Sequence, residues 1–199
     1  MDKCFIATSS EGQYCATFFM EVLDAILKQA GLDIECVLWR EARGFSALND
    51  ATLTRLVAIG RDEIAYSIAF FTPDDLSTSR GQSQIVARDN VLFEYGLFLG
   101  MLGGKRSFAV VPQDEEGRNS IKLPSDICGI GLPRYKFNGF DCTKYSQRDF
   151  FRTALSIVRA IKGDDPPPDG EASTENPPIE SKIAPRIRDD EDSRPFSSY

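Results

Sequence analysis

Apolar residues in the first 162 positions form short continuous runs that alternate with longer stretches in which they recur every three or four residues. Five runs predict strands: 4–8, 34–39, 64–71, 107–111 and 132–137. The run 64–71 is apolar at nearly every position, which is typical of a parallel strand covered on both faces. The chain therefore builds its core from buried strands rather than from half-exposed ones.

Helical spacing predicts the elements between these strands. One amphipathic helix covers about residues 15–30, a second follows a cap at Asn49, a third covers 88–102, and a closing helix covers 151–161. The segment 72–86 is rich in Ser, Gly and Gln and is expected to be a loop. The resulting order, β-α-β-α-β-α-β-loop-β-α, predicts an α/β fold with a parallel sheet of about five strands, flanked by helices and wound as in flavodoxin.

The end of the chain has a different composition. Residues 163–199 contain seven of the eleven prolines and ten acidic against four basic residues. Such a segment cannot bury enough apolar surface to fold alone, so we expect one domain, 1–162, followed by a disordered acidic tail, 163–199. A solubilising role and a regulatory role for this tail both remain open.

Charge and apolar content exclude several classes of partner. The net charge is −7, of which the tail carries −6 and residues 1–162 carry −1. Neither part has the basic surplus that binding to nucleic acid or to an anionic membrane requires. The chain also lacks an N-terminal secretory signal and any apolar run of about 20 residues. We therefore expect a soluble cytoplasmic protein.

The chain contains no histidine, which excludes several classes of catalytic and metal site. Ser-His-Asp and Cys-His catalysis and histidine metal sites are excluded, and five widely spaced cysteines without a CxxC pair predict reduced thiols and no metal cluster. Neither a GxGxxG fingerprint after the first strand nor a P-loop is present. Any catalysis must rest on carboxylates, other nucleophilic or basic side chains, or a bound cofactor.

Ligands of a doubly wound sheet bind beyond the carboxyl ends of its strands. The loops to search are therefore 9–12, 40–46 and 72–86. The first of them brings two serine hydroxyls and free backbone amides to a helix N-terminus, which suits a phosphate or a nucleotide hydroxyl. Capping of the helix would explain the same serines without a ligand.

Glu94 is the only charged residue between Asp89 and Lys105. Its helix is apolar nearly all round, which predicts that the helix is largely buried. A carboxylate there is costly unless it is paired, hydrogen-bonded or placed at a cavity, so it either pairs with a basic residue or has a function. Gly96 and Gly100 lie four residues apart on the same helix, and close packing is the expected reason for them.

One carboxylate is sufficient for one reaction in particular. Cleavage of the N-glycosidic bond of NAD+ expels neutral nicotinamide without a general acid and passes through an oxocarbenium-like state that a carboxylate stabilises. A site with one buried Glu and no histidine fits that reaction and would be poor for amide hydrolysis.

Three segments carry a family resemblance. The strand and loop IAFFTPDD, the helix ARDNVLFEYGLFLGMLG and the later LPSDICGI resemble the TIR-like domain of bacterial nucleotide-binding and anti-phage effectors, found in CBASS and Pycsar systems and fused to bacterial STING. The resemblance covers residues 3–138. It implies a flavodoxin-like TIR fold and hydrolysis of NAD+, as substrate rather than cofactor, to nicotinamide and linear or cyclic ADP-ribose.

The resemblance also implies the residues of the site. The catalytic residue would be Glu94, inside the helix motif. The residues that would border the nucleotide are Ser9, Ser10, Glu11, Arg43, Phe45, Asp74, Asp75, Arg88 and Asn90.

Regulation is where the chain departs from this pattern. Family effectors usually carry a sensor domain for a cyclic nucleotide, and residues 163–199 are too few and too polar to form one. The chain would be a stand-alone member, a piece of a longer protein, or a protein that a sensor or activator switches on in trans, with self-association through TIR surfaces. Two alternatives to hydrolysis remain: a non-catalytic nucleotide-binding or interaction module, and a nucleoside deoxyribosyltransferase-like enzyme.

Overall fold

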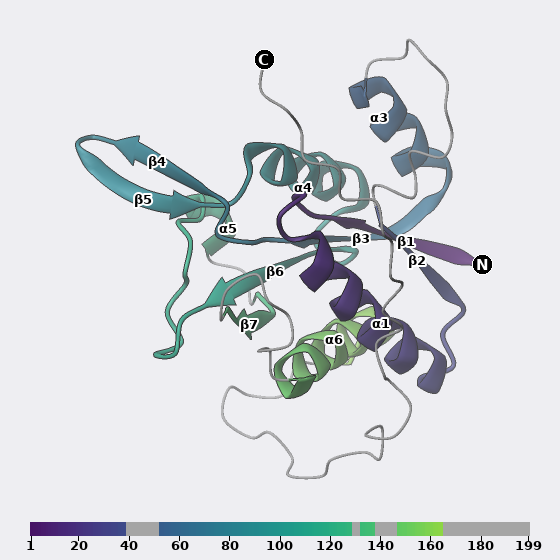
Figure 1. The fold of residues 1–199 in the computed structure, drawn as a ribbon. Coiled ribbons are helices and arrows are strands. Elements are labelled where there is room, and N and C mark those ends of the chain that lie inside the picture. Colours follow the sequence, from purple (N-terminus) through teal and green to yellow (C-terminus); the bar gives the residue numbers. More distant parts are fainter. Residues whose placement is uncertain (39–51, 129–131, 138–146, 165–199) are drawn as a thin grey trace, which may run out of the picture. The chain divides into compact units, whose positions relative to one another are not determined.

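A computed structural model of the chain describes residues 1–38, 52–128, 132–137 and 147–164, all within one unit, Met1–Pro166. Five parallel strands form a sheet in the order β2-β1-β3-β6-β7 (Figure 1). They are β1 (Asp2–Ala7), β2 (Ile34–Leu38), β3 (Ile64–Phe70), β6 (Ser107–Gln113) and β7 (Arg134–Lys136). This is the flavodoxin-like α/β order of a TIR domain, so the predicted fold class is confirmed.

Helices cover both faces of the sheet (Figure 1). One face carries α1 (Gln13–Gln29) and α6 (Gln147–Lys162), and the other carries α3 (Thr52–Asp62) and α4 (Asp89–Leu102). A short helix, α5 (Ser125–Cys128), precedes β7. The cap expected at Asn49 lies outside the described residues. None of the helices in the described ranges is long and apolar enough to cross a membrane.

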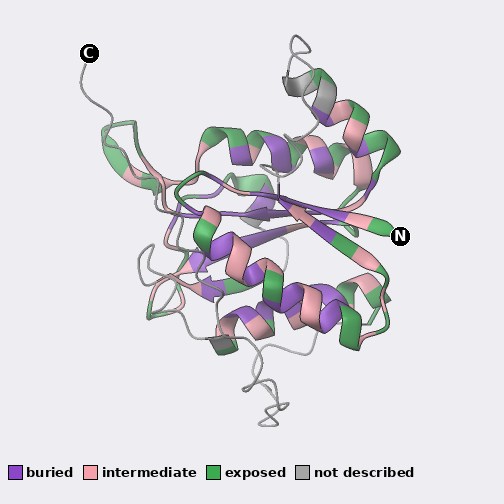
Figure 2. Ribbon diagram, turned by 45° about the vertical axis from the view of Figure 1, so that its right-hand side comes forward, coloured by how far each residue is buried: buried purple, intermediate pink, exposed green. Residues whose placement is uncertain are grey.

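Two apolar cores follow from this layering, and β3 contributes to both. Ile68 and Phe70 belong to the core under α1 and α6, whereas Ala69 and Phe71 belong to the core under α4. Successive side chains of a strand point to opposite faces, which explains why the run is continuously apolar. Figure 2 shows the buried sides of the helices facing the sheet.

The expectation of a loop at 72–86 is wrong. This segment contains an antiparallel hairpin of β4 (Asp75–Ser79) and β5 (Gln82–Val86), which extends from one end of the sheet (Figure 1). Its turn places Arg80 at φ 52° and Gly81 at φ 76°, the positive angles of a type I′ turn. Its strands are mostly polar, and the apolar pair Leu76 and Ile85 is exposed, so no buried-strand pattern marks them.

The helix α4 is less buried than its composition predicts. Its buried side chains are Val91, Glu94, Tyr95 and Phe98, along the side that faces the sheet, whereas Phe93 on the other side is 54% exposed. The helix α4 has apolar residues on all sides, but only the side that faces the sheet is buried. What covers a helix depends on its neighbours rather than on its own composition.

Close packing does not explain the two glycines of α4. Among the described residues, a Cβ placed on Gly96 or Gly100 would meet no atom within 4 Å apart from the nearby backbone of α4 itself. Because alanine favours a helix over glycine by about 1 kcal/mol, we expect Gly96→Ala to raise the melting temperature by roughly 2–4 °C. Thermal unfolding followed by circular dichroism measures this shift. A lower melting temperature would mean that another surface contacts this side of α4.

The closing helix α6 ends with a defined cap. Gly163 has φ 79°, and the backbone N–H groups of Gly163 and Asp164 donate to the carbonyls of Ala160 and Arg159 at 3.1 and 3.0 Å. This combination of a left-handed glycine and backward hydrogen bonds terminates a helix. The helix ends at Lys162, where the sequence predicts the end of the domain.

We propose that residues after Asp164 add little to the stability of the domain. A chain that ends at Asp164 keeps the helix cap and the whole described core. Its melting temperature is expected to lie within roughly 2 °C of that of the full chain, as measured by calorimetry. A fall of many degrees would show that the acidic segment contributes to folding.

Candidate active site

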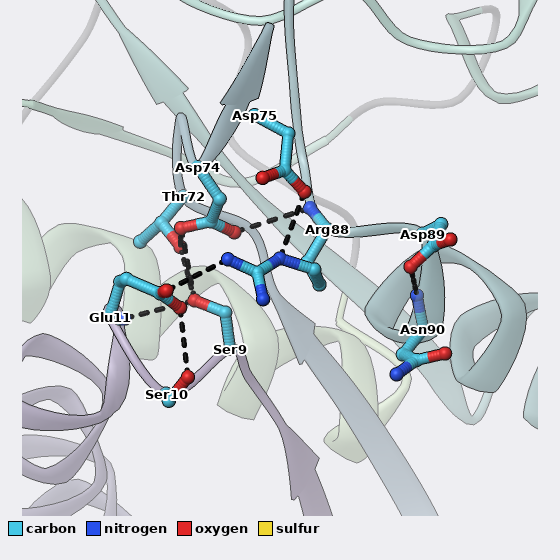
Figure 3. Close-up of polar contacts among 10 residues, drawn as sticks. Ser9, Ser10, Glu11, Thr72, Asp74, Asp75, Arg88, Asp89 and Asn90 are labelled. Carbon is cyan, nitrogen blue, oxygen red and sulfur yellow. Dashed lines mark hydrogen bonds and ion pairs between the residues drawn. The ribbon is translucent and has the colours of Figure 1, made fainter. Parts of the chain in front are cut away.

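The candidate site forms where the loops after β1 and β3 meet the start of α4 (Figure 3). Strands β1 and β3 are adjacent and parallel, with Ala7 opposite Ala69, so their carboxyl ends lie side by side. The chain continues from β1 to Ser9 and from β3 to Thr72 and Asp74. This is the edge at which doubly wound sheets bind ligands, as the sequence predicts.

Asp74 accepts hydrogen bonds from three segments of the chain. Its Oδ1 receives the hydroxyl of Ser9 at 3.0 Å and that of Thr72 at 2.7 Å, and its Oδ2 receives the backbone N–H of Arg88 at 3.2 Å. The hydroxyl oxygens of Ser9 and Thr72 are 3.0 Å apart. Ser9 and Thr72 are buried, so these contacts are shielded from water. We call Ser9, Thr72, Asp74 and the backbone of Arg88 the Asp74 junction.

The guanidinium of Arg88 bridges two of the same loops (Figure 3). Its Nη2 donates to Glu11 Oε1 at 2.8 Å, and its Nε lies 2.8 Å from Asp75 Oδ2 as an ion pair rather than a directed hydrogen bond. The hydrogen bond with Glu11 is the largest cause that raises the pKa of Arg88. Burial opposes it, and the charges of Asp75, Glu11 and Asp74 raise the pKa further. A hydrogen bond to its own backbone N–H, then those from Ser10 and Arg88, lower the pKa of Glu11. The pair therefore stays charged at neutral pH.

The loop after β1 packs tightly against the loop after β3 at Gly12. The backbone N–H of Gly12 donates to Ser9 Oγ at 2.9 Å. A Cβ on Gly12 would lie 2.7 Å from Thr72 Oγ1 and 2.8 Å from Thr8 Oγ1. Gly12 is thus required by the close approach of the two loops, since its φ of −80° suits any residue. Sequence reasoning missed Gly12 and Thr72 as site residues, because only the contact between the loops gives them a role.

Glu94 is 7% exposed, so its predicted burial is confirmed. It belongs to the side of α4 that faces the sheet, between Val91 and Phe98. The ring of Phe98 stacks on Phe5 of β1 at 4.7 Å, which fixes the helix against the strand that leads into the first loop. Glu94 follows Arg88 by six residues, about 9 Å along a helix. The same helix thus carries the buried carboxylate and starts at the Asp74 junction.

The sequence-predicted residues divide into three groups. The structure brings together Ser9, Glu11, Asp74, Asp75 and Arg88, and Ser10 joins them by donating to Glu11 Oε2 at 2.9 Å. Asn90 lies exposed in the first turn of α4, where its backbone N–H donates to Asp89 Oδ1 at 2.7 Å. Arg43 and Phe45 lie outside the described residues.

Neither serine of the first loop is the N-cap of α1, so the capping interpretation is wrong, although Ser9 does bind a backbone N–H at the helix start. The backbone N–H of Gly12 is bound by Ser9, while the N-cap of α1 is Gly12 itself, without a side-chain cap. Ser9 therefore has a structural role whether or not a ligand binds. Within the described ranges no three Cys, Asp or Glu side chains are placed to hold a metal ion.

The charges around Arg88 set the kind of chemistry that the edge can perform. Glu11 and Asp75 pair with the guanidinium of Arg88, and Asp74 binds the backbone N–H of the same residue. Glu11, Asp75 and Arg88 are each about one third to one half exposed at the side chain. Such a partly open guanidinium can exchange a carboxylate for a phosphate oxygen, because both make the same charge-assisted hydrogen bonds. A buried carboxylate about one and two thirds helical turns farther along α4 can stabilise a developing positive charge.

Comparison with known proteins identifies relatives over the same region. The family described as CAP12/Pycsar effector protein, TIR domain, matches residues 3–136. The CD-NTase-associated protein 12 of Sphingobacterium faecium is 35% identical over 68% of this chain and 37% of its own length. The protein of the same name from Flavobacterium daejeonense is 36% identical over 67% of this chain and 38% of its own length. The Pycsar effector protein XpPycTIR of Xanthomonas perforans is 32% identical over 72% of this chain and 43% of its own length. The chain thus spans about two fifths of the length of these curated relatives.

Proposed function

The chain belongs to the TIR-domain family of CAP12 and Pycsar effector proteins, and from this premise we propose that it is an NAD+ nucleosidase with Glu94 as its catalytic residue. The activity would serve anti-phage defence and would be switched on by assembly of the domains. The observation that carries the proposal is the burial of Glu94, at 7% exposure, on the helix that starts at the ligand-binding edge of the sheet.

The reaction needs little from the protein. The bond between C1′ of the ribose and the nicotinamide nitrogen breaks, and its electron pair leaves with nicotinamide, which becomes neutral. The carboxylate of Glu94 stabilises the positive charge that develops on the ribose. Water then adds to C1′ and releases a proton, which gives ADP-ribose, whereas attack by the adenine ring gives the cyclic product.

The loops at the edge of the sheet would hold the rest of the nucleotide. Arg88 is the cation beside the first loop, and the pyrophosphate of NAD+ would replace Glu11 as its partner. Ser10 and Asn90 are exposed and would donate to phosphate or ribose oxygens. Arg43 and Phe45 are proposed from the family resemblance alone.

Nicotinamide release from NAD+ by the purified chain tests this function. The measurement should compare dilute protein with concentrated protein in a crowding agent, because assembly is expected to activate the domain. Release that rises more steeply than protein concentration supports the proposal. Exchange of free bases on a deoxynucleoside, without nicotinamide release, would favour a deoxyribosyltransferase-like enzyme instead.

A second candidate function is an interaction module that binds a nucleotide without turning it over. Large apolar side chains are exposed on the hairpin, at Leu76 and Ile85, and on α4, at Phe93. Such side chains are typical of surfaces that another protein covers. Calorimetric binding of NAD+ or ADP-ribose at a stoichiometry of one, with no product even in the assembled state, would favour this module over the enzyme.

A further inference from the structure

We infer that Asp74 is a positioning residue, which sets the first loop against the helix of Glu94, and not a ligand of the nucleotide. The inference rests on the proposed function for its catalytic consequence. Its structural basis is the Asp74 junction, in which one carboxylate joins the loop after β1, the end of β3 and the start of α4 (Figure 3).

The backbone of Asp74 is itself held in place. Its N–H lies 3.1 Å from the carbonyl of Thr72 and 3.2 Å from that of Val86, the last residue of the hairpin. The hairpin base is tied in turn to a later segment, because the N–H of Lys122 donates to the carbonyl of Ile85 at 2.8 Å. Asp74 therefore projects from a braced backbone toward the loop after β1 and the start of α4, the same two parts that the Arg88–Glu11 ion pair joins closer to solvent.

Both oxygens of the carboxylate are already used. Oδ1 accepts two hydroxyl hydrogens and Oδ2 accepts a backbone N–H, and a carboxylate can only accept. Three of the roughly four acceptor sites of the carboxylate are therefore filled, and both sites of Oδ1 are used. The two donors to Oδ1, Ser9 and Thr72, are 5% and 1% exposed, so little of this carboxylate is open to a sugar hydroxyl. Asp75, by contrast, has a side chain that is 44% exposed and forms an ion pair with Arg88 at the solvent-exposed rim of the site.

The junction controls where Glu94 stands. Glu94 follows Arg88 on one continuous helix, so a shift of the helix start carries the carboxylate with it. A misplacement of about 1 Å in an active site can cost roughly a hundredfold in rate. Loss of Asp74 also removes one negative charge beside Arg88, which reduces repulsion of the pyrophosphate. The turnover number should therefore fall while NAD+ binding is preserved.

The first part of the test needs no catalysis. A double-mutant cycle compares the melting temperatures of four proteins: the unaltered chain, Ser9→Ala, Asp74→Ala and the double variant. Because either single change breaks the same hydrogen bond, the fall in the double variant should be smaller than the sum of the single falls by about 2 °C or more. If the two single losses of melting temperature add up to the loss in the double variant, the two side chains are not coupled and the inference is overturned.

The second part separates positioning from binding. With NAD+ as the probe, Asp74→Ala should lower kcat about tenfold or more and change KM less than about threefold, and Asp74→Asn, which keeps an acceptor and a similar shape, should recover part of kcat. Asp75→Asn removes the same charge from the rim and should lower kcat less than Asp74→Ala does. A KM raised tenfold with kcat preserved would make Asp74 a nucleotide ligand and overturn the inference. If the unaltered chain releases no nicotinamide in any state, the proposed function fails and the thermal cycle alone confirms or overturns the junction.

Discussion

Replacing Glu94 by glutamine is expected to lower nicotinamide release from NAD+ by about 10²-fold or more, with little change in the fold. The amide has nearly the same shape as the carboxylate but carries no charge, so it cannot stabilise the positive charge that develops on the ribose. Glu94 is 7% exposed on the side of α4 that faces the sheet, where solvent screening is weak. Steady-state assay of nicotinamide under assembling conditions measures the effect.

The matched control is Glu21→Gln, which makes the same chemical change on the exposed side of α1. Its turnover should stay within about twofold of that of the unaltered chain, since surface substitutions have small effects. Circular dichroism should give the same spectrum for both variants. Turnover by Glu94→Gln equal to that of the control would remove Glu94 from the mechanism and leave the binding module as the better proposal.

Gly12→Ala is expected to have the largest effect among changes outside the reacting groups. The added Cβ would lie 2.7 Å from Thr72 Oγ1 and 2.8 Å from Thr8 Oγ1, well inside ordinary contact distance. Thr72 cannot turn away cheaply, because it is 1% exposed and its hydroxyl donates to Asp74 at 2.7 Å. Overpacking of this kind costs about 1–3 kcal/mol. The loops after β1 and β3 should move apart, which also disturbs the Asp74 junction.

Two measurements check this prediction. The melting temperature should fall by roughly 2–4 °C for each kcal/mol lost, and NAD+ turnover should fall further than the loss of folded protein explains. Gly96→Ala is the matched control, since the same substitution there meets no described residue outside α4 within 4 Å and is expected to stabilise the chain. If Gly12→Ala were as stable and as active as the unaltered chain, the close contact of the two loops would not matter to the site.

The element order could be predicted from the sequence because strand and helix patterns are local. The continuous apolar run of β3 and the three-to-four spacing of α1 are visible within single windows of the chain. The same local reasoning failed for the hairpin of β4 and β5, whose strands are polar and expose Leu76 and Ile85. A hairpin of this kind is specified by its turn, where Arg80 and Gly81 take positive φ, and that signal is weak without the structure.

The candidate site divides in the same way. Glu94 is conspicuous in the sequence as one charge in a long apolar helix, and its burial follows from that local contrast. The roles of Gly12 and Thr72 are invisible there, because they arise from contacts between loops about sixty residues apart, such as the 3.0 Å contact of Ser9 with Thr72. The family resemblance indicated Asp74 and Arg88 as site residues without indicating that they bind the chain itself.

The sequence alone determined the α/β class, the order of the five sheet strands and of the main helices between them, and the buried carboxylate, since each depends on the hydrophobic pattern within one element. Only the tertiary structure decided which loops touch and which side of α4 is covered. Arg88 and Glu11 are 77 residues apart along the chain, and their 2.8 Å ion pair exists because parallel strands bring their carboxyl ends to one edge. Contacts of that range depend on how the elements pack, and no local pattern records them.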